Sequence, residues 1–432
     1  MTPMKLAILL LSTLLSTPAL PQTPAVFTKA MAERPDVKAA LGYIDANFDK
    51  QVAEWITLTE IPALSTHEEK RAAYVMAELA KIPGLEVTKD EIGNITVIRR
   101  GVGPSTGSLP GQAGQAQTIV MAAHMDTVHP MDADLKVKKL PDGTLHAPGI
   151  FDNTASVANA LQTLRAMNAA KIRTKGDIYY VFTVQEELGL KGMYYWLDHH
   201  PNLATLIVAS DGGLPDVNYG ALGIYWSKMK FTAAGAHTLN SRNQPHPARA
   251  AAQCITDIYS ISLPPANDPV PAVYNVGMMG GGTVVNAIAP ENWFTVDLRT
   301  IDPVLLKDLD AQIMTKCRAA AAAQGVTFTR EFIQKSEAGG RPETLAARLN
   351  HPIVRTPVEV LKYLDMTAIT TPTGSTDANV GIVHGIPSVS IGRAKGGNQH
   401  SLSEWADEAS AKFGAQSLLL IVIALAELSN PG

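Results

Sequence analysis

Residues Thr118-Ile-Val-Met-Ala-Ala-His124-Met-Asp126 join a short, continuous apolar run to two polar residues that follow it directly. An apolar run of this length without polar alternation is typical of a strand buried on both faces, as in the middle of a parallel sheet. Similar runs occur at 177–183 and 206–210, and a helix is predicted from 152 to about 170. Apolar strands that alternate with helices predict an α/β fold with a parallel or mixed sheet.

The order of elements changes between residues 218 and 336. Strands are expected at 224–232, 273–279, 284–289, 293–299 and 327–333, and helices at 248–261 and 303–323. We expect 284–289 and 293–299 to form a hairpin around Pro290, within the β-α-β-β-α-β order of a ferredoxin-like unit. The α/β pattern then resumes with a helix at 352–364, a strand at 386–391 and a helix at 409–428. The sequence therefore predicts a larger domain made of 26–217 and 337–432, with a smaller domain, 218–336, inserted into it.

The N-terminus has the order of a secretory signal peptide. Lys5 precedes an apolar run at 6–11, and the small residues Ser16, Thr17 and Ala19 follow. This pattern predicts that 1–25 is a signal peptide and that the mature protein is periplasmic or secreted. The alternative is an apolar, frayed N-terminus of a cytosolic protein. No later segment reaches the roughly 18 apolar residues that a membrane-spanning helix needs, so we expect no membrane span in the mature chain.

Charge and cysteine content exclude some classes of function. The chain has 36 Lys and Arg against 40 Asp and Glu, a net charge of −4, without a basic cluster, which argues against a nucleic-acid partner. Cys254 and Cys317 do not form a Cys-x-x-Cys pair, so a thiolate zinc site is excluded. Both lie on the apolar faces of predicted helices and would be buried free thiols, unless export allows them to form a disulfide. The sequence leaves both possibilities open.

Several polar residues stand at the carboxyl ends of predicted strands, where open α/β sheets bind ligands. They are His124, Asp126, Glu186, Glu187 and Asp211, with Asp152 at the start of a helix and His400 in a later loop. Taken singly, Asp152 is explained as a helix cap, Asp211 as a turn residue and His400 as a loop histidine. Together, two imidazoles and several carboxylates suit divalent zinc, manganese or cobalt, whose charge makes a carboxylate cluster tolerable.

These motifs resemble a known family. His124-Met-Asp126, Asp152-Asn153, Glu186-Glu187-Leu-Gly189, Asp211-Gly-Gly and His400-Ser, in this order, are similar to the co-catalytic zinc peptidases, which include glutamate carboxypeptidase, aminoacylase, succinyl-diaminopimelate desuccinylase and peptidase T. The resemblance covers residue 36 to the end, because the Gly-Gly-Thr-Val-Val-Asn286 segment and the later Val-Asp-Leu-Arg299 resemble the family's lid signature. It implies a zinc-exopeptidase-like α/β fold, with a mixed sheet, helices on both faces and an inserted ferredoxin-like α+β lid domain.

The resemblance also implies roles for the polar residues. Asp152 would bridge two divalent metal ions. Zinc is the expected metal, with cobalt or manganese as alternatives. His124 and Asp211 would be additional ligands of one ion, and Glu187 and His400 would be additional ligands of the other. Asp126 would accept a hydrogen bond from the His124 ring, and Glu186 would be the general base that moves a proton from the attacking water to the leaving amine. The family often has a cis peptide at the position of Asp152-Asn153.

Substrate-binding residues are less well defined. His237 resembles the family histidine that stabilises the oxyanion, often across a dimer, with His246 as the competing candidate. Asn286 would hydrogen-bond substrate or stabilise a turn, and Gly374 begins a segment similar to the family's substrate-proximal loop. Arg393 would pair with a substrate carboxylate or be a solvated arginine, and Arg299 is expected to form an ion pair with Asp297. The sequence departs from the family at Asn153, Gln185 and Ser375, where an acid, an acid and a glycine are common.

The sequence therefore predicts an exported, metal-dependent exopeptidase or amidohydrolase that cleaves di- or tripeptides and forms a homodimer through the lid domain. An N-acyl amino acid deacylase of the same family is the alternative enzyme. A non-catalytic, exported solute-binding protein is the alternative class, although the general base Glu186 argues against it. The inserted domain argues against the zinc aminopeptidase relatives that lack a lid. The substrate and the end at which it is cleaved are not determined by the sequence.

Overall fold

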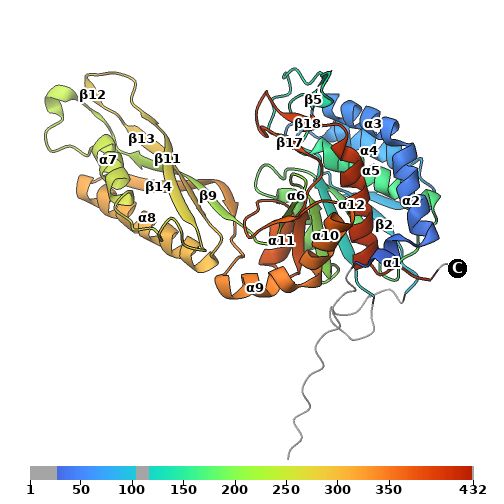
Figure 1. Cartoon of the computed structure of the whole chain (residues 1–432). Coiled ribbons are helices and arrows are strands. Elements are labelled where there is room, and N and C mark those ends of the chain that lie inside the picture. The colour runs from blue at the N-terminus through green and yellow to red at the C-terminus, as the bar shows by residue number, and fades with distance from the viewer. Residues whose placement is uncertain (1–26, 104–115, 431–432) are drawn as a thin grey trace, which may run out of the picture.

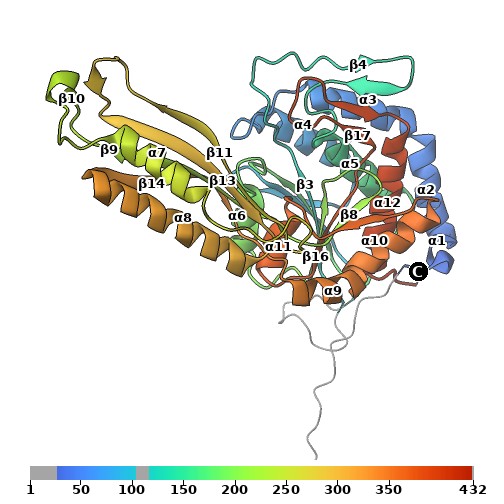
Figure 2. The ribbon, with the colours of Figure 1, turned by 60° about the vertical axis from the view of Figure 1, so that its left-hand side comes forward.

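The computed structural model describes residues 27–103 and 116–430, so the predicted signal peptide lies outside the described residues. A larger unit contains an eight-stranded sheet, and a smaller unit, residues 223–336, extends from one side of it (Figures 1 and 2). The chain runs from the larger unit into the smaller unit and then returns to the larger unit.

The large sheet is mixed. Its strands run in the order β1 (Glu86–Lys89), β2 (Ile95–Arg99), β6 (Ile178–Thr183), β3 (Ile119–His124), β7 (Leu206–Ser210), β16 (Ser388–Ile391), β8 (Asp216–Asn218) and β15 (Ile369–Thr371). The four central strands β6, β3, β7 and β16 are parallel, whereas at one edge β2 pairs antiparallel with β6, and β1 pairs antiparallel with β2. Every residue of these four central strands is buried, which explains the nearly continuous apolar sequences of β3, β6 and β7. β16 is also buried, although two of its four residues, Ser388 and Ser390, are polar.

Helices cover both faces of this sheet, as predicted. One face packs against α2 (Pro35–Ala46), α3 (Phe48–Glu60), α4 (Glu69–Leu79), α5 (Thr154–Ala169), α10 (Pro352–Tyr363) and α12 (Ser410–Leu425). The other face packs against α6 (Lys191–His199) and α11 (Ala378–Val383). Alternate residues of β3 serve the two cores: Met121 faces the first group of helices and Val120 the second. Two peripheral helices are α1 (Lys29–Ala32) and α9 (Pro342–Asn350).

The smaller unit is a four-stranded antiparallel sheet with its own apolar core. The strand order is β11 (Ala272–Gly281), β13 (Glu291–Thr300), β9 (Gly223–Thr232) and β14 (Thr327–Ser336), which is the ferredoxin-like arrangement. Helices α7 (Pro247–Ile258) and α8 (Pro303–Gln324) pack on the sheet and against each other. A disulfide between Cys254 and Cys317 joins the two helices, so of the two possibilities that the sequence left open, the structure has the disulfide.

One predicted pairing in the smaller unit is also wrong. β13 pairs with β11 and β9, whereas the segment expected to be its hairpin partner contains only the short strand β12 (Ala287–Ile288). β12 pairs with β10 (Ala236–His237), which a 3₁₀ turn (Thr238–Asn240) follows. Val284 and Val285 are 61% and 102% exposed, because this apolar segment projects beyond the sheet. An apolar pattern therefore did not indicate burial here.

A second small sheet lies over the carboxyl ends of the central strands. It contains β17 (Gly396–Gly397), β18 (Trp405–Asp407), β5 (Thr144–His146) and β4 (Lys138–Lys139). These strands are too short to be predicted from sequence, yet they place the loop after β17 beside the segment that precedes α5. Among the described residues, none of the helices combines the length and the apolar character that crossing a membrane requires.

Candidate functional site

The predicted site residues meet at one edge of the large sheet. His124 is the last residue of β3, Glu186 and Glu187 follow β6, and Asp211 follows β7. Because these three strands are parallel neighbours, their carboxyl ends lie side by side. Asp152 comes from the turn before α5, and the loop between β17 and β18 adds His400 from 248 residues further along the chain. All five predicted metal-ligating residues, and Glu186, are therefore brought together.

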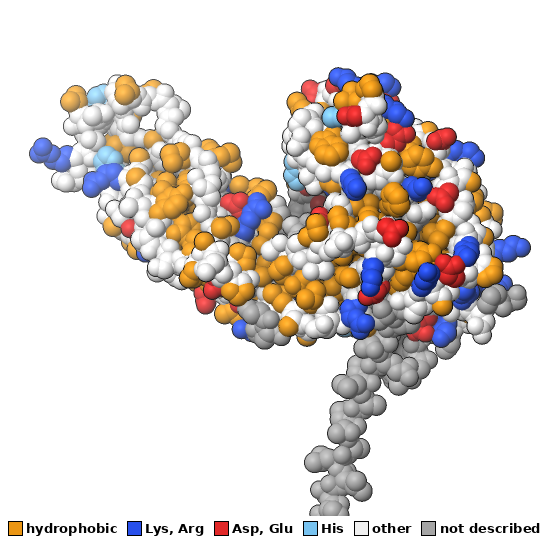
Figure 3. All heavy atoms as spheres, in the orientation of Figure 1, with side chains coloured by type: hydrophobic (Ala, Val, Ile, Leu, Met, Phe, Trp, Pro, Cys, Tyr) orange, Lys and Arg blue, Asp and Glu red, His pale blue; other side chains and the backbone are white. Residues whose placement is uncertain are grey.

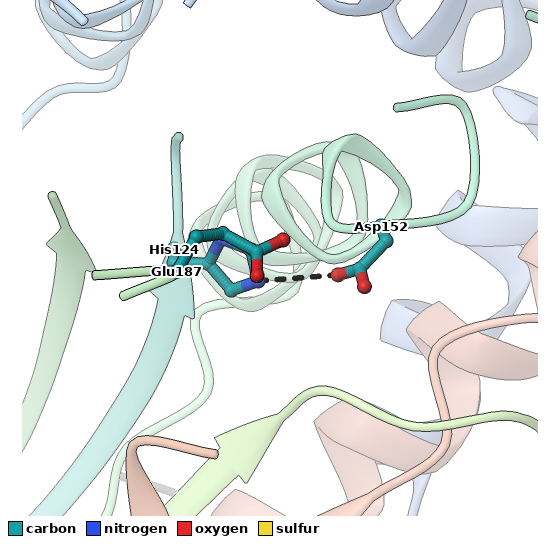
Figure 4. Close-up of side chains that lie close together, drawn as sticks. All are labelled: His124, Asp152 and Glu187. Atoms are coloured by element: carbon teal, nitrogen blue, oxygen red, sulfur yellow. Dashed lines mark hydrogen bonds and ion pairs between the residues drawn. The ribbon is translucent and has the colours of Figure 1, made fainter. Parts of the chain in front are cut away.

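Asp152 lies between the two imidazoles. Its Oδ1 is 3.2 Å from Nε2 of His124, and its Oδ2 is 3.5 Å from Nε2 of His400. On the first side, Asp211 Oδ2 is 3.8 Å from His124 Nε2, and on the second side, Glu187 Oε1 is 3.0 Å from His400 Nε2. Figure 4 shows how Asp152 at the start of α5 faces His124 and Glu187 at the strand ends. The two oxygens of one carboxylate thus point to two separate groups of donors, and the Asp152–Asn153 peptide is cis.

The donor set fits divalent metal ions. The ligand atoms of His124, Asp152 and Glu187 lie within 4.8 Å of one another, as do those of His124, Glu186 and Asp211. Imidazole nitrogens combined with carboxylate oxygens are the donors that zinc and similar ions take in proteins. Four carboxylates at such short distances repel one another unless positive charge is placed among them. The chemistry of the donors and their spacing therefore support a metal centre.

The electrostatics of the cluster reflect this need for positive charge. Burial lowers the pKa of His124, but the carboxylates of Glu186, Asp126 and Asp152 outweigh it and hold the pKa well above its usual value. Hydrogen bonds to Asp152 and Glu187 raise the pKa of His400 to about 10. Burial raises the pKa of Glu186 well above its usual value, with further contributions from the charges of Asp211 and Glu187. In the absence of metal, these shifts favour the protonated forms of His124, His400 and Glu186.

Asp126 organises the residues around it. Its carboxylate is completely buried and accepts hydrogen bonds from Ser65 Oγ at 2.6 Å and from the backbone N–H groups of Glu186 and Glu187 at 3.1 and 3.2 Å. Its Oδ1 lies 3.4 Å from Nδ1 of His124, whereas the backbone carbonyl of Asp126 is nearer to that nitrogen, at 3.1 Å. Asp126 therefore orients the His124 ring with both its backbone and its side chain.

Arg393 lies beneath the cluster and is only 1% exposed, so a solvated arginine is excluded. Its guanidinium forms a close ion pair with Asp211, and its Nη2 is 3.3 Å from Oδ1 of Asp152. The guanidinium also lies 4.2 Å from the centre of the Phe151 ring. The carboxylates that Arg393 contacts here thus belong to the cluster itself, and pairing with a substrate carboxylate stays a prediction.

A pocket of about 310 Å³ opens above the cluster, between the two units. The space-filling view shows the hollow that separates these units (Figure 3). The larger unit contributes Val128, Ser375 and all of the cluster residues except His124, and the smaller unit contributes Ile224, Trp226, Arg299 and Gln334. Arg299 forms the expected ion pair with Asp297 at 3.0 Å and lies over the Trp226 ring. Its place in the pocket wall was missed, because strand alternation does not tell which face of the inserted sheet turns toward the cluster.

Two of the predicted substrate-binding residues lie far in space from the pocket of the same chain. Both are exposed: His237 is the last residue of β10, and Asn286 directly precedes β12, at the far end of the smaller unit (Figures 1 and 2). His237 Nδ1 accepts a hydrogen bond from the N–H of Leu239. Gly374 is nearer, since Ser375 lines the pocket, and the Gly374 carbonyl accepts hydrogen bonds from the Leu222 N–H and the Asn379 amide.

Comparisons with known proteins show which chains this one resembles. The uncharacterized protein YqjE of Bacillus subtilis (strain 168) is 24% identical over 354 residues, which span 80% of this chain and 90% of that protein. The cytosol non-specific dipeptidase of Escherichia coli (strain K12) is 30% identical over 149 residues, 32% of this chain and 28% of that protein.

Solved structures show the same architecture. A tripeptidase from Staphylococcus aureus has a TM-score of 0.71 at 21% identity, covering 88% of this chain and 99% of that one. The aminopeptidase PepT from Bacillus cereus has a TM-score of 0.68 at 19% identity, with the same coverage. Residues 120–424 match the model of peptidase family M20/M25/M40 and include every member of the cluster. This chain therefore belongs to peptidase family M20/M25/M40 and is a metal-dependent hydrolase.

Proposed function

We propose that this protein is an exopeptidase that cleaves di- or tripeptides and binds two divalent metal ions on either side of Asp152. Zinc is the metal that we expect. The observation that carries the proposal is that the two oxygens of Asp152 face His124 and His400 separately. Asp211 would complete the first site and Glu187 the second. When bound, such ions polarise the scissile carbonyl and lower the pKa of the water that attacks it.

Glu186 is proposed as the general base. Its side chain is buried, lines the pocket and approaches His124 Nε2 to 3.9 Å, so it lies at the centre of the cluster. The next residue, Glu187, contacts His400 instead. In this position Glu186 can take a proton from the attacking water and deliver it to the amine that leaves.

The pocket supports a small substrate with a free carboxylate. Its volume of about 310 Å³ is at the lower end of the range of roughly 300–1,000 Å³ for small-molecule sites. Arg299 places a guanidinium in the wall, which suits a terminal carboxylate, and Trp226 and Ile224 offer an apolar surface for a side chain. The dipeptidase and tripeptidase among the similar proteins favour peptides. An N-acyl amino acid has the same carboxylate, so deacylase activity is the second candidate.

Export and dimerisation belong to the same proposal. The disulfide between α7 and α8 supports export, because disulfides persist in oxidising compartments.

The edge strand β11 supports a dimer in which the smaller unit, as the lid domain, forms the interface. β11 contains no charged residue, and its Val273, Met278 and Met279 are exposed. Natural edge strands usually carry charges that prevent pairing with another chain. In such a dimer, His237 would act on the oxyanion in the partner's pocket.

Metal analysis combined with a hydrolysis screen tests the proposed function. The purified mature protein would be assayed on di- and tripeptides and on N-acyl amino acids, with and without a chelator. We expect about two metal ions per chain and release of a free amine from peptides that stops when the chelator is added. Release from N-acyl amino acids alone would favour the deacylase. A protein that binds no zinc, cobalt or manganese would contradict the metal centre.

A further inference from the structure

Glu404 lies four residues after the cluster residue His400, and its side chain is completely buried. Its carboxylate accepts three backbone hydrogen bonds from the turn that precedes α5. Oε1 accepts from the N–H groups of Phe151 and Asp152 at 2.8 and 2.7 Å, and Oε2 accepts from that of Gly149 at 2.8 Å. One of these donors is the backbone of Asp152 itself, so Glu404 holds the residue whose carboxylate lies between the two imidazoles.

The same carboxylate also contacts the segment that follows β3. Oε2 of Glu404 lies 3.4 Å from Nε2 of His129, a buried residue five positions after His124. Glu404 itself belongs to the loop between β17 and β18, which carries His400. The buried side chain of Glu404 therefore contacts the segments that carry His124 and Asp152, and Glu404 itself lies in the segment that carries His400.

The rest of the turn is held by groups that cannot replace Glu404. Trp55 Nε1 donates to the carbonyl of Ile150 at 2.6 Å, and Thr154 Oγ1 donates to the carbonyl of Gly149 at 2.7 Å. Both are donors to carbonyls, whereas Glu404 supplies the acceptor for three N–H groups. A buried N–H group that loses its acceptor is costly, so the turn would shift to find new partners, and Asp152 would shift with it.

We infer that Glu404 is a positioning residue for the metal centre, which fixes Asp152 relative to both His124 and His400. This inference rests on the proposed function, since it requires that Asp152 binds metal. Residues that orient metal ligands through hydrogen bonds typically change metal affinity when they are replaced. A residue that only stabilised the fold would change the stability of the metal-free protein and leave its metal affinity unaltered.

The test compares Glu404→Gln with Glu54→Gln in the full mature protein. Glutamine keeps the size of the side chain but presents an NH₂ group to at least one backbone N–H, and so breaks part of the three-donor arrangement. Glu54 is a matched control, because it is also buried and accepts hydrogen bonds through both oxygens, from Arg165 at 2.6 and 2.7 Å. Its partner Arg165 lies in α5 and is not a member of the cluster.

Metal-stripped proteins would be titrated with Co²⁺ in competition with a chelator, with visible absorption as the readout and apo-protein melting measured in parallel. We expect Glu404→Gln to bind Co²⁺ about 10- to 100-fold more weakly than the wild type, and Glu54→Gln to bind it as the wild type does, although both melt at lower temperature. Wild-type affinity in Glu404→Gln would overturn the inference. A wild-type protein that binds no Co²⁺, Zn²⁺ or Mn²⁺ would overturn the proposed metal centre itself, which is a distinct result.

A second variant covers the case in which Glu404→Gln does not fold. Glu404→Asp keeps the carboxylate but withdraws it by one methylene group, so it cannot reach all three N–H groups at their present distances. We expect a smaller loss of Co²⁺ affinity in the same direction. Unchanged affinity in a folded Glu404→Asp protein would show that the position of this carboxylate does not matter to the metal centre, and would also overturn the inference.

Discussion

The carboxylate of Asp126 accepts a hydrogen bond from the backbone N–H of Glu186, with 3.1 Å between Oδ1 and the nitrogen. Asp126 follows β3 and Glu186 follows β6, so this bond joins the carboxyl ends of two neighbouring parallel strands. The second oxygen of Asp126 accepts from the next N–H, that of Glu187, at 3.2 Å. One buried carboxylate thus fixes the backbone of both glutamates, whose side chains turn to different partners.

Replacing Glu186 by glutamine removes the proposed general base while keeping its size. We expect Glu186→Gln to lower kcat by about 100- to 10,000-fold, the usual contribution of a general base, and to leave the metal content unchanged. Steady-state kinetics and elemental analysis of the same preparation check this. Glu187→Gln is the contrasting variant, because Glu187 contacts His400 and its replacement should reduce metal content. Turnover at the wild-type rate in Glu186→Gln would remove this residue from the mechanism.

Metal stoichiometry distinguishes a bridging from a terminal ligand. Asp152 faces both imidazoles, so Asp152→Ala should weaken both metal sites, whereas His400→Ala should weaken only the site that it shares with Glu187. We expect about two ions per chain in the wild type, one in His400→Ala and none in Asp152→Ala after dialysis. Retention of both ions by Asp152→Ala would contradict the bridging role.

Arg299 is expected to select substrates with a free carboxylate. Arg299 lines the pocket, and its guanidinium lies over the Trp226 ring and pairs with Asp297 through Nε. Losing a hydrogen bond to a charged group costs about 1.5–3 kcal/mol, so Arg299→Met should lower kcat/KM for free peptides by roughly 10- to 100-fold. C-terminally amidated peptides provide the comparison, since they lack the carboxylate and should be affected little. An equal loss for both kinds of peptide would show that Arg299 does not read the carboxylate.

The oligomeric state tests the role of the edge strand β11. Met279 is 67% exposed on β11, and Met279→Lys would place a charge on this uncharged edge. We expect the wild type to have the mass of a dimer in light scattering coupled to gel filtration, and the variant to have that of a monomer. Ile333→Lys on the opposite edge strand, β14, is the control, because Ile333 is also exposed but β14 already carries charges. Dissociation by both variants, or by Ile333→Lys alone, would place the interface elsewhere.

Asp377 should make the stability of the metal-free protein depend on pH. Burial raises the pKa of Asp377 to about 7, and Oδ2 accepts a hydrogen bond from Thr183 Oγ1. Between about pH 4 and pH 7 the unfolded chain releases this proton while the folded chain retains it, so stability falls as pH rises. Below about pH 4 Asp377 is protonated in both the folded and the unfolded state. Above about pH 7 its contribution to the free energy of unfolding no longer changes with pH.

Asp377→Asn removes this titration while keeping an acceptor for Thr183. The free energy of unfolding of the variant, relative to the wild type, should therefore increase from pH 4 to pH 7 by up to about 4 kcal/mol. Denaturant unfolding in the presence of a chelator, at several pH values, measures this difference. A difference between the two proteins that does not change with pH would show that Asp377 titrates normally in the folded state.

The amino-acid sequence was sufficient for the central strands, the element order of both units and the members of the cluster. β3, β6 and β7 are continuous apolar runs because both of their faces are buried, and burial on both faces is visible in local sequence. His124, the two glutamates and Asp211 follow these runs directly. Parallel strands place their carboxyl ends together, so adjacency in space followed from the strand assignment alone.

Other features were decided only by tertiary structure. The segment 284–289 has a strand-like pattern but projects beyond the sheet, and the short strands of the second small sheet have no pattern of their own. Arg299 was assigned only an ion pair, although it also lines the pocket.

The contact between Glu404 and Asp152 spans 252 residues. Local sequence encodes periodicity and burial, which depend on nearby residues. Contacts across such separations depend on how whole units pack, and the sequence of neither segment alone reveals its partner.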